Sequence, residues 1–224
     1  MNPADAIEVA APDTVAPIDW LRLIPQPNPE RLAAEASRRE LAAAALTRDR
    51  VRIACAALPA RYGLSLHDAA LMSRVRSPIA IRDSVAASSA VAAVWTGGSG
   101  MGKSTLAAAA AREWATQRGG GRIVWARAAS LAVASRYHAL GAGQPPALAE
   151  AERADLLVLD ELGESQRTAQ WDDVAEVLFS RYERGASTWI TTWLSEDQMT
   201  NQYGDGFARR VFERAAIVRC GVSA

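Results

Sequence analysis

The sequence predicts an α/β fold in which a parallel sheet lies between helices, with a helical extension before it. From residue 91 onward, short apolar segments alternate with longer segments of helical length, and glycines close three of the longer ones. The apolar segments are continuous, as in strands that are covered on both faces. Of the 224 residues, 50% are hydrophobic, which allows a sizeable core and excludes a globally disordered chain.

Residues 1–27 are expected to form a flexible arm. Acidic and small residues separate five prolines in this stretch, a composition typical of mobile segments: Pro3, Pro12, Pro17, Pro25 and Pro27. An apolar cluster between residues 18 and 24 interrupts the arm. Such a cluster either docks on a partner or folds back on its own domain.

Residues 28–77 are predicted to form a helical region. Asn28 can cap a helix and Pro29 suits its first position, so we expect a long helix up to about residue 58. Ser65 and Asp68 are spaced as a capping box for a shorter helix that ends near residue 72. Pro78 then opens a third helical segment and the predicted core domain, residues 78–224.

The core domain is expected to alternate strands with helices. Apolar runs of strand length, alanine-rich runs of helix length and the glycines that end them set the boundaries. Strands are predicted over residues 91–96, 123–126, 156–160, 188–192 and 217–219, and helices over residues 104–117, 129–140, 171–184 and 207–214.

A phosphate-binding motif lies between the first strand and helix of the core. Residues 97–104 read GGSGMGKS and match G-x-x-x-x-G-K-[ST], the P-loop pattern. Its glycines let backbone N–H groups surround phosphates at the positive end of a helix. The motif predicts an ATP site contacted by Gly97, Gly98, Ser99, Gly100, Met101, Gly102, Lys103, Ser104 and Thr105.

Lys103 and Ser104 have the chemical roles in this motif. Lys103 is expected to reach the β- and γ-phosphates, and Ser104 to bind Mg²⁺. Lys103 is the single lysine among 25 basic residues, whereas the other 24 are arginine. A compact ammonium suits this position better than a planar guanidinium, so its retention in an arginine-rich chain supports the site.

Two acidic residues follow the apolar strand at residues 156–159. Asp160 is expected at the carboxyl end of that strand, where it can orient Mg²⁺. Glu161 is placed to activate a water molecule as a general base. Small-molecule kinases and GTPases do not need this glutamate, whereas ATPases that activate water do, so the pair predicts an ATPase.

Four further segments resemble one family in their order and spacing. They are LPARY at residues 58–62, the acidic strand followed by Leu-Gly at residues 156–163, LFSRYER at 178–184 and GFARRVFE at 206–213. Together with the P-loop they resemble AAA+ ATPases of the bacterial helicase-loader type (DnaC-like) and their relatives, the transposition helpers (IstB-like). The resemblance covers residues 58–219 and implies a P-loop NTPase fold of the AAA+ type.

The same resemblance implies an arginine that acts on a neighbouring subunit. Arg210 matches the family's arginine finger, which stabilises charge on the γ-phosphate, and Arg209 is the second candidate. A finger that acts in trans implies self-association into a ring or spiral, because one subunit cannot complete its own site.

One strand departs from the family's pattern. The family ends this strand in Thr-Ser-Asn, and the asparagine senses the γ-phosphate, whereas Trp193 occupies that position here. Thr191 and Thr192 remain as polar candidates, and we assign the sensing role to Thr192, with slow hydrolysis expected. Trp193, like the other tryptophans of the predicted strands, is expected in the core or in an interface between subunits.

Composition limits the partners and the location. The formal net charge is zero and the pI is about 6.8, so DNA contact requires a local basic patch. Cys55 and Cys220 are too far apart in sequence to indicate a zinc site or a disulfide framework. With no secretory signal and no apolar run long enough to span a membrane, we expect a cytoplasmic protein.

Three functions fit these observations. The first is an ATP-dependent loader that delivers a replicative helicase to single-stranded DNA, with residues 28–77 binding the partner as the family's N-terminal regions do. The second is a transposition helper that engages duplex DNA and a transposase. The third is a nucleotide-gated adaptor with little hydrolysis, which the substitution at Trp193 favours.

Overall fold

The computed structural model describes residues 28–75, 77–139, 141–163 and 171–221. The chain divides into two compact units, Met1–Ala43 and Ala44–Ala224. Apart from Asn28, the described part of the first unit belongs to helix α2 (Pro29–Ala56), which continues into the second. Asn28 caps α2 as predicted, since the N–H of Glu30 donates to its Oδ1 at 2.9 Å. The expected flexible arm lies outside the described residues.

Three short helical segments lead into the core. They are η1 (Ala60–Tyr62), α3 (Ala69–Arg74) and α4 (Pro78–Ala87). The capping box predicted at Ser65 is wrong, because Asp68 itself caps α3 by accepting from the N–H of Ala70 at 2.9 Å. Ser77 caps α4 through the N–H of Ala80, so Pro78 begins that helix as expected.

Five parallel strands form one sheet in the order β2-β3-β4-β1-β5. The strands are β1 (Ala92–Thr96), β2 (Ile123–Arg127), β3 (Leu156–Leu162), β4 (Ser187–Thr192) and β5 (Ala215–Arg219). All five coincide with predicted strands, with shifts of a few residues at the ends. Because the strands are parallel, all their carboxyl ends meet at one edge of the sheet.

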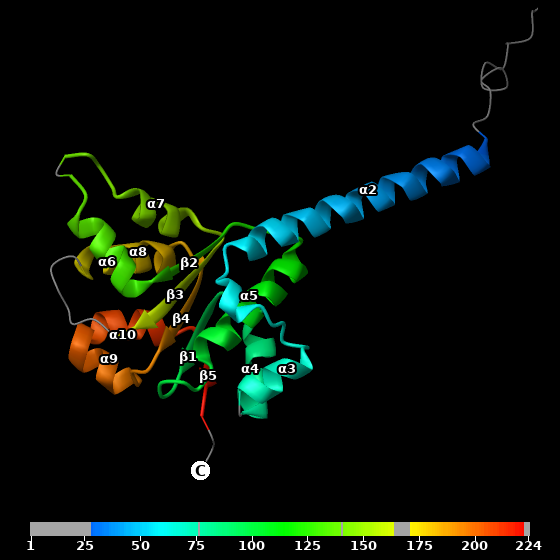
Figure 1. Ribbon diagram of the computed structural model, residues 1–224. Helices are drawn as coiled ribbons and strands as arrows, with labels where there is room; N and C mark the ends of the chain where they lie inside the picture. The colour runs from blue at the N-terminus through cyan, green and yellow to red at the C-terminus, as the bar shows by residue number, and fades with distance from the viewer. Residues whose placement is uncertain (1–27, 76, 140, 164–170, 222–224) are drawn as a thin grey trace, which may run out of the picture. The chain divides into compact units, whose positions relative to one another are not determined.

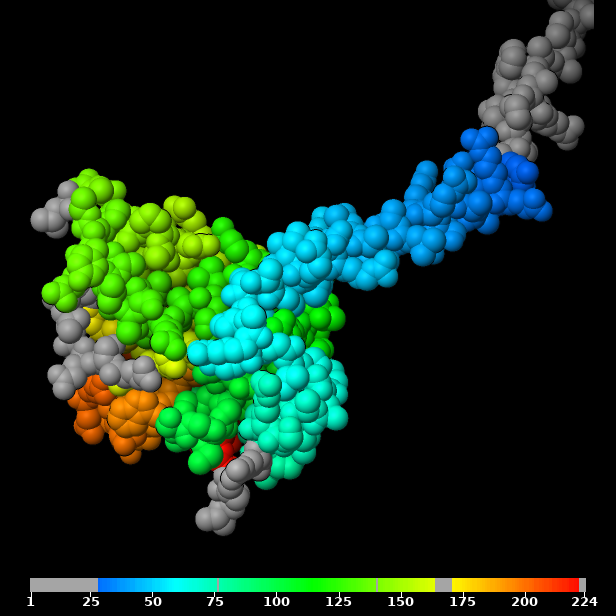
Figure 2. Space-filling model, viewed as in Figure 1, coloured from blue at the N-terminus to red at the C-terminus, as the bar shows by residue number. Residues whose placement is uncertain are grey.

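Helices cover both faces of this sheet (Figure 1). Helices α4 and α5 (Lys103–Arg118) lie on one face, and α6 (Ala128–Arg136), α7 (Pro146–Arg153), α8 (Trp171–Glu183) and α10 (Asp205–Phe212) on the other. In the space-filling view the packed helices leave little of the sheet visible (Figure 2). The expected parallel sheet between helices is therefore confirmed.

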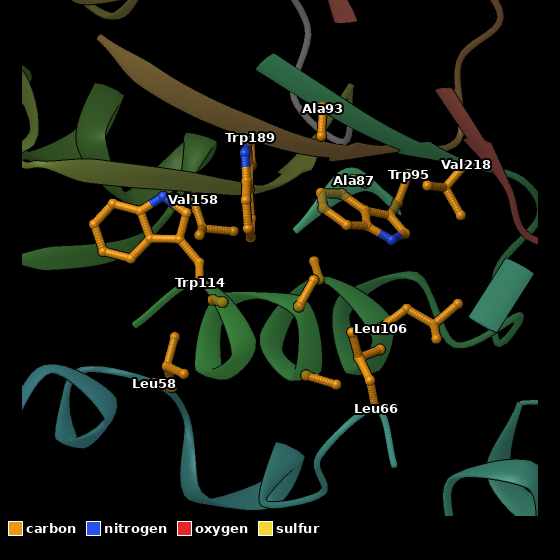
Figure 3. Close-up of a cluster of buried hydrophobic side chains, with 14 of the residues drawn as sticks. Leu58, Leu66, Ala87, Ala93, Trp95, Leu106, Trp114, Val158, Trp189 and Val218 are labelled. Atoms are coloured by element: carbon orange, nitrogen blue, oxygen red, sulfur yellow. The ribbon is translucent and has the colours of Figure 1, made fainter. Parts of the chain in front are cut away.

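Buried side chains hold α5 between the sheet and the segment that contains Leu58 and Leu66. Figure 3 shows Trp95 and Trp189 projecting from the strands toward α5, with Leu58 and Leu66 on the other side of that helix. Both indoles are fully buried, and their N–H groups donate to Ser84 Oγ at 2.9 Å and to the carbonyl of Ala90 at 3.0 Å. The start of α5, where the P-loop motif ends, is thereby fixed against the sheet.

Candidate nucleotide site

A bulge at the end of β3 places the two predicted carboxylates. Leu159 pairs with Ile190 and Leu162 with Thr192, so β3 has one residue more than β4 in this interval. Glu161 lies in this bulge with φ of 61°, the only positive φ outside glycine in the described chain. Such a backbone conformation is unfavourable for glutamate and occurs chiefly where function requires it.

Asp160 is the centre of a buried hydrogen-bond network. Ser104 Oγ donates to its Oδ1 at 2.7 Å, and Thr191 Oγ1 donates to the same oxygen at 2.6 Å. The hydroxyl of Thr191 also accepts from the N–H of Glu161 at 2.9 Å. The network joins α5, β3 and β4, and it brings the two predicted metal ligands, Ser104 and Asp160, into direct contact.

The second oxygen of Asp160 indicates a cation site. Asp160 is fully buried, and its Oδ2 has no hydrogen-bond partner in the described structure. A buried carboxylate oxygen without a partner is costly unless a cation or a donor satisfies it. Hydroxyl and carboxylate oxygens are the ligands that Mg²⁺ prefers, so Ser104 and Asp160 fit this ion.

The P-loop wraps tightly against its surroundings. A Cβ on Gly97 (φ 140°) would lie 2.0 Å from the carbonyl oxygen of Cys220, and one on Gly102 (φ 82°) would lie 2.8 Å from Val75. Only glycine fits both places. Lys103 donates to the carbonyls of Gly97 and Gly98, each at 2.8 Å, so its ammonium lies over the loop.

A cavity of about 560 Å³ opens in front of these groups. Most of the predicted nucleotide-contacting residues line it, namely Gly98, Ser99, Gly100, Gly102, Lys103, Ser104 and Thr105. Glu161 and Thr192 line it as well, together with Tyr62 and Trp193, which were not assigned to the site from the sequence. A cavity of this size is within the range of small-molecule sites.

Arg127 contacts the predicted general base, a relationship that the sequence pattern did not reveal. Its Nε lies 2.9 Å from Glu161 Oε2, and both side chains are partly exposed. Arg127 ends β2, where it pairs in register with Asp160. The contact follows from strand order, because β2 neighbours β3 in the sheet. Only a correct prediction of that order would have identified Arg127.

The two threonines of β4 have different surroundings. The hydroxyl of Thr192 donates to the carbonyl of Leu162 at 2.7 Å and accepts from the N–H of Leu194 at 3.0 Å. Backbone groups therefore occupy the Thr192 hydroxyl, whereas Thr191 contacts Asp160 and the backbone of Glu161. Trp193 is not in the core: its side chain is 47% exposed at the cavity.

Arg210 lies away from these groups. It lines a second cavity with Ala92 and Ala186, which lie at the amino ends of β1 and β4. Its guanidinium stands 4.5 Å from the ring centroid of Phe179, and Nη1 donates to the carbonyl of Gly206 at 2.9 Å. Arg209 is exposed on the same helix. The structure thus brings together every predicted catalytic residue except Arg210.

The geometry defines a class of protein. A P-loop between β1 and α5, an Asp-Glu pair on a strand that is not adjacent to β1, and a parallel sheet covered on both faces characterise a P-loop NTPase. The family of IstB-like ATP-binding proteins matches residues 38–216, most of the chain. The chain therefore belongs to the IstB-like ATP-binding family. No curated protein sequence matches it.

Solved structures share the fold. A DnaC helicase loader aligns with a TM-score of 0.57 at 18% identity, over 72% of this chain and 99% of that one. AMPPCP-bound DnaA from Aquifex aeolicus gives 0.52 at 20% identity over 64% and 46% of the two chains, and DnaI gives 0.51 at 19% over 71% and 86%. These likenesses show that the fold is shared, so the predicted fold class is confirmed. Among the described residues, no helix is long and apolar enough to cross a membrane.

Proposed function

We propose that this protein is an ATPase that works as an oligomer in the cytoplasm. The observation that carries the proposal is the shared cavity, in which Lys103, Ser104 and Glu161 surround one space. When ATP binds, its β- and γ-phosphate oxygens would replace the loop carbonyls as the groups that accept hydrogen bonds from Lys103. Backbone N–H groups of the P-loop would bind the phosphates at the amino end of α5.

Hydrolysis would depend on four residues at the carboxyl ends of β3 and β4 and the start of α5. Glu161 would accept a proton from the attacking water, and its backbone is fixed by the bond to Thr191. We favour Thr191 over Thr192 as the polar group that links the strand to the site, because backbone groups occupy the Thr192 hydroxyl. Ser104 and Asp160 would hold Mg²⁺, which supplies positive charge beside the phosphate oxygens.

The position of Arg210 supports an action in trans. The P-loop and the carboxylates lie at the carboxyl ends of the strands, whereas Arg210 lies beside the amino end of β1. The five residues of β1 span about 16 Å, so Arg210 cannot reach its own site while it packs on Phe179. A second copy would supply the arginine, and repetition of that contact gives a ring or spiral.

We further propose that the ATPase loads a replicative helicase onto single-stranded DNA. The fold shared with a DnaC helicase loader supports this role. Another relative of the same fold is a DnaA initiator bound to AMPPCP and single-stranded DNA. On this chain, Arg136 and Tyr137 are exposed neighbours at the end of α6, and Arg136 Cζ lies 5.9 Å from the centroid of the Tyr137 ring. Such a pair is suited to phosphate and base contacts. Residues 28–77 would bind the helicase.

A second candidate function is that of a transposition helper on duplex DNA. The match to the IstB-like family favours it. A nucleotide-gated adaptor is the third, because Trp193 occupies the position of the family's asparagine.

Steady-state hydrolysis distinguishes the three. The full chain would be assayed alone, with single-stranded DNA and with duplex DNA, beside Lys103→Ala and Arg210→Ala variants. We expect stimulation by single strands that both substitutions abolish. Stimulation by duplex DNA alone would support the transposition helper. Binding of ATP without turnover under any condition would contradict the ATPase and leave the adaptor.

A further inference from the structure

A cavity beside Arg210 is apolar inside and basic at its rim. It measures about 300 Å³, and Phe179, Phe207 and Val211 contribute to its walls. An apolar cavity of about 150 Å³ accommodates benzene, so this one has room for a larger aromatic ring. Arg210 and Arg214 also line it, and their guanidinium groups lie over the rings of Phe179 and Tyr182 at 4.5 and 5.1 Å.

Beside the nucleotide site, the segment from Trp193 to the start of α9 presents the opposite features. Trp193 stands at its cavity with 47% of its surface exposed, whereas the tryptophans of β1 and β4 are fully buried. Glu196 and Asp197 follow in the first turn of α9 (Glu196–Tyr203), and both are exposed. The segment from Trp193 to Asp197 therefore combines one exposed aromatic ring with acidic side chains.

The two surfaces are complementary. Arg210 and Arg214 line the apolar cavity, and Arg209 is exposed on the same helix as Arg210. The nearby Glu213 already accepts a hydrogen bond from Tyr182 at 2.7 Å. Aromatic rings are attracted to guanidinium groups, and tryptophan gives the strongest such contact. Within one chain the surfaces lie at opposite edges of the sheet, so one molecule cannot join them.

We propose that Trp193 of one copy inserts into the Arg210 cavity of the next. This inference rests on the proposed action of Arg210 in trans, and it names the contact that would bring the arginine to the neighbouring site. Trp193 lines the nucleotide cavity, so any surface that delivers an arginine there must also meet Trp193. Insertion buries the indole between arginines and places Glu196 and Asp197 opposite the basic rim.

The test uses the full chain with Mg²⁺ and an ATP analogue that resists hydrolysis. Sedimentation velocity would compare the wild type with Trp193→Ala, which removes the inserted ring, and Ala186→Phe, which fills the cavity from its wall. Val91→Arg, at an exposed residue of the cavity lining, serves as a second cavity variant. Met72→Ala is the matched control, because Met72 on α3 is 50% exposed and lies in neither surface.

We expect the association constant to fall at least about 30-fold in both Trp193→Ala and Ala186→Phe, as for a central tryptophan of an interface. Val91→Arg should weaken association too, and Met72→Ala should match the wild type. A mixture of Trp193→Ala with Ala186→Phe should form dimers, because one chain supplies the ring and the other the open cavity.

Three results would contradict the inserted tryptophan or the oligomeric function on which it rests. Trp193→Ala chains that associate like the wild type, or a mixture no more associated than its two components, would overturn the inserted tryptophan. Circular dichroism melting of each variant excludes loss of the fold as the cause. If the wild type and the Met72→Ala chain remain monomeric with nucleotide, the proposed oligomeric function fails as well.

Discussion

Arg127 and Glu161 form an ion pair that restrains the proposed general base. The Nε–Oε2 distance is 2.9 Å, and the pair is partly exposed. Arg127→Ala should raise basal ATP hydrolysis about two- to fivefold, since a pair of this kind contributes up to about 1 kcal/mol. Steady-state turnover without DNA measures the effect. The double variant with Glu161→Gln should be inactive, and a lower rate in Arg127→Ala would show that the arginine assists hydrolysis.

Asp160 is maintained at some cost in stability. Its buried Oδ2 has no partner in the described structure, and an unsatisfied charged atom costs about 1–3 kcal/mol or more. Asp160→Asn should therefore unfold at the same or a higher denaturant concentration than the wild type without ligand. It should also lose the stabilisation that Mg²⁺ and ATP give. A less stable variant would indicate that the network at Oδ1 needs the charge.

The two cysteines should react differently. Cys220 is buried beside the P-loop, and burial raises the pKa of its thiol to about 12. At pH 8 a thiol reagent should modify Cys55 within minutes and Cys220 only after unfolding. A Cys55→Ser variant that still shows a fast-reacting thiol would refute this difference in reactivity.

The raised pKa of Cys220 also makes stability depend on pH. Because the folded-state pKa of Cys220 exceeds the ordinary value, its contribution to stability is complete below about pH 9 and declines as the pH rises through that range toward 12.

At the scale of the elements, Arg181 joins α8 to α7 and β4. The side chain is fully buried, and it donates to the carbonyls of Ala151 and Ala154 at 3.0 and 2.8 Å and to Thr188 Oγ1 at 3.0 Å. Burial lowers the pKa of the guanidinium to about 10. Arg181 donates hydrogen bonds to carbonyls at the end of α7, and β3 begins shortly after that helix. Arg181 therefore fixes the start of the strand that bears Asp160.

Arg181→Met should lower the free energy of unfolding by roughly 3–5 kcal/mol, because several buried carbonyls lose their donor. Urea unfolding followed by circular dichroism measures the change. Arg184→Met provides the comparison, since Arg184 also donates to the carbonyl of Glu152 but is about half exposed. It should cost less than about 1 kcal/mol. Equal losses in the two variants would rule out a special role for the buried arginine.

Four strands were predictable because they are apolar over most of their length, and β4 because it is rich in β-branched residues. The P-loop was predictable because its spacing is rarely met by chance. Two helices were not predicted. Helix α7 has eight residues between prolines and polar turns, too short for a clear helical period. Helix α9 carries a recognisable signal in the sequence, the capping box of Ser195 and Gln198. The β3 bulge and the contacts of Arg127 and Arg181 depend on tertiary packing, which local patterns do not encode.

For the molecule as a whole, separate positions for Arg210 and the P-loop make hydrolysis depend on association. Turnover per chain should rise with protein concentration and then level off, because only associated copies have complete sites. The dependence should be absent in Arg210→Ala, whose rate should remain low throughout. A constant turnover across a hundredfold dilution series would mean that each chain completes its own site.

Lys103 is the single lysine of the sequence, and two carbonyls of the P-loop hold its ammonium. A protease that cleaves only after lysine would therefore cut this sequence once, into fragments of 103 and 121 residues. Its target bond begins α5 and becomes accessible only when the loop and the first turn of that helix open. The rate of this single cut is thus a direct record of how often the P-loop opens, and bound ATP should slow it in proportion to occupancy.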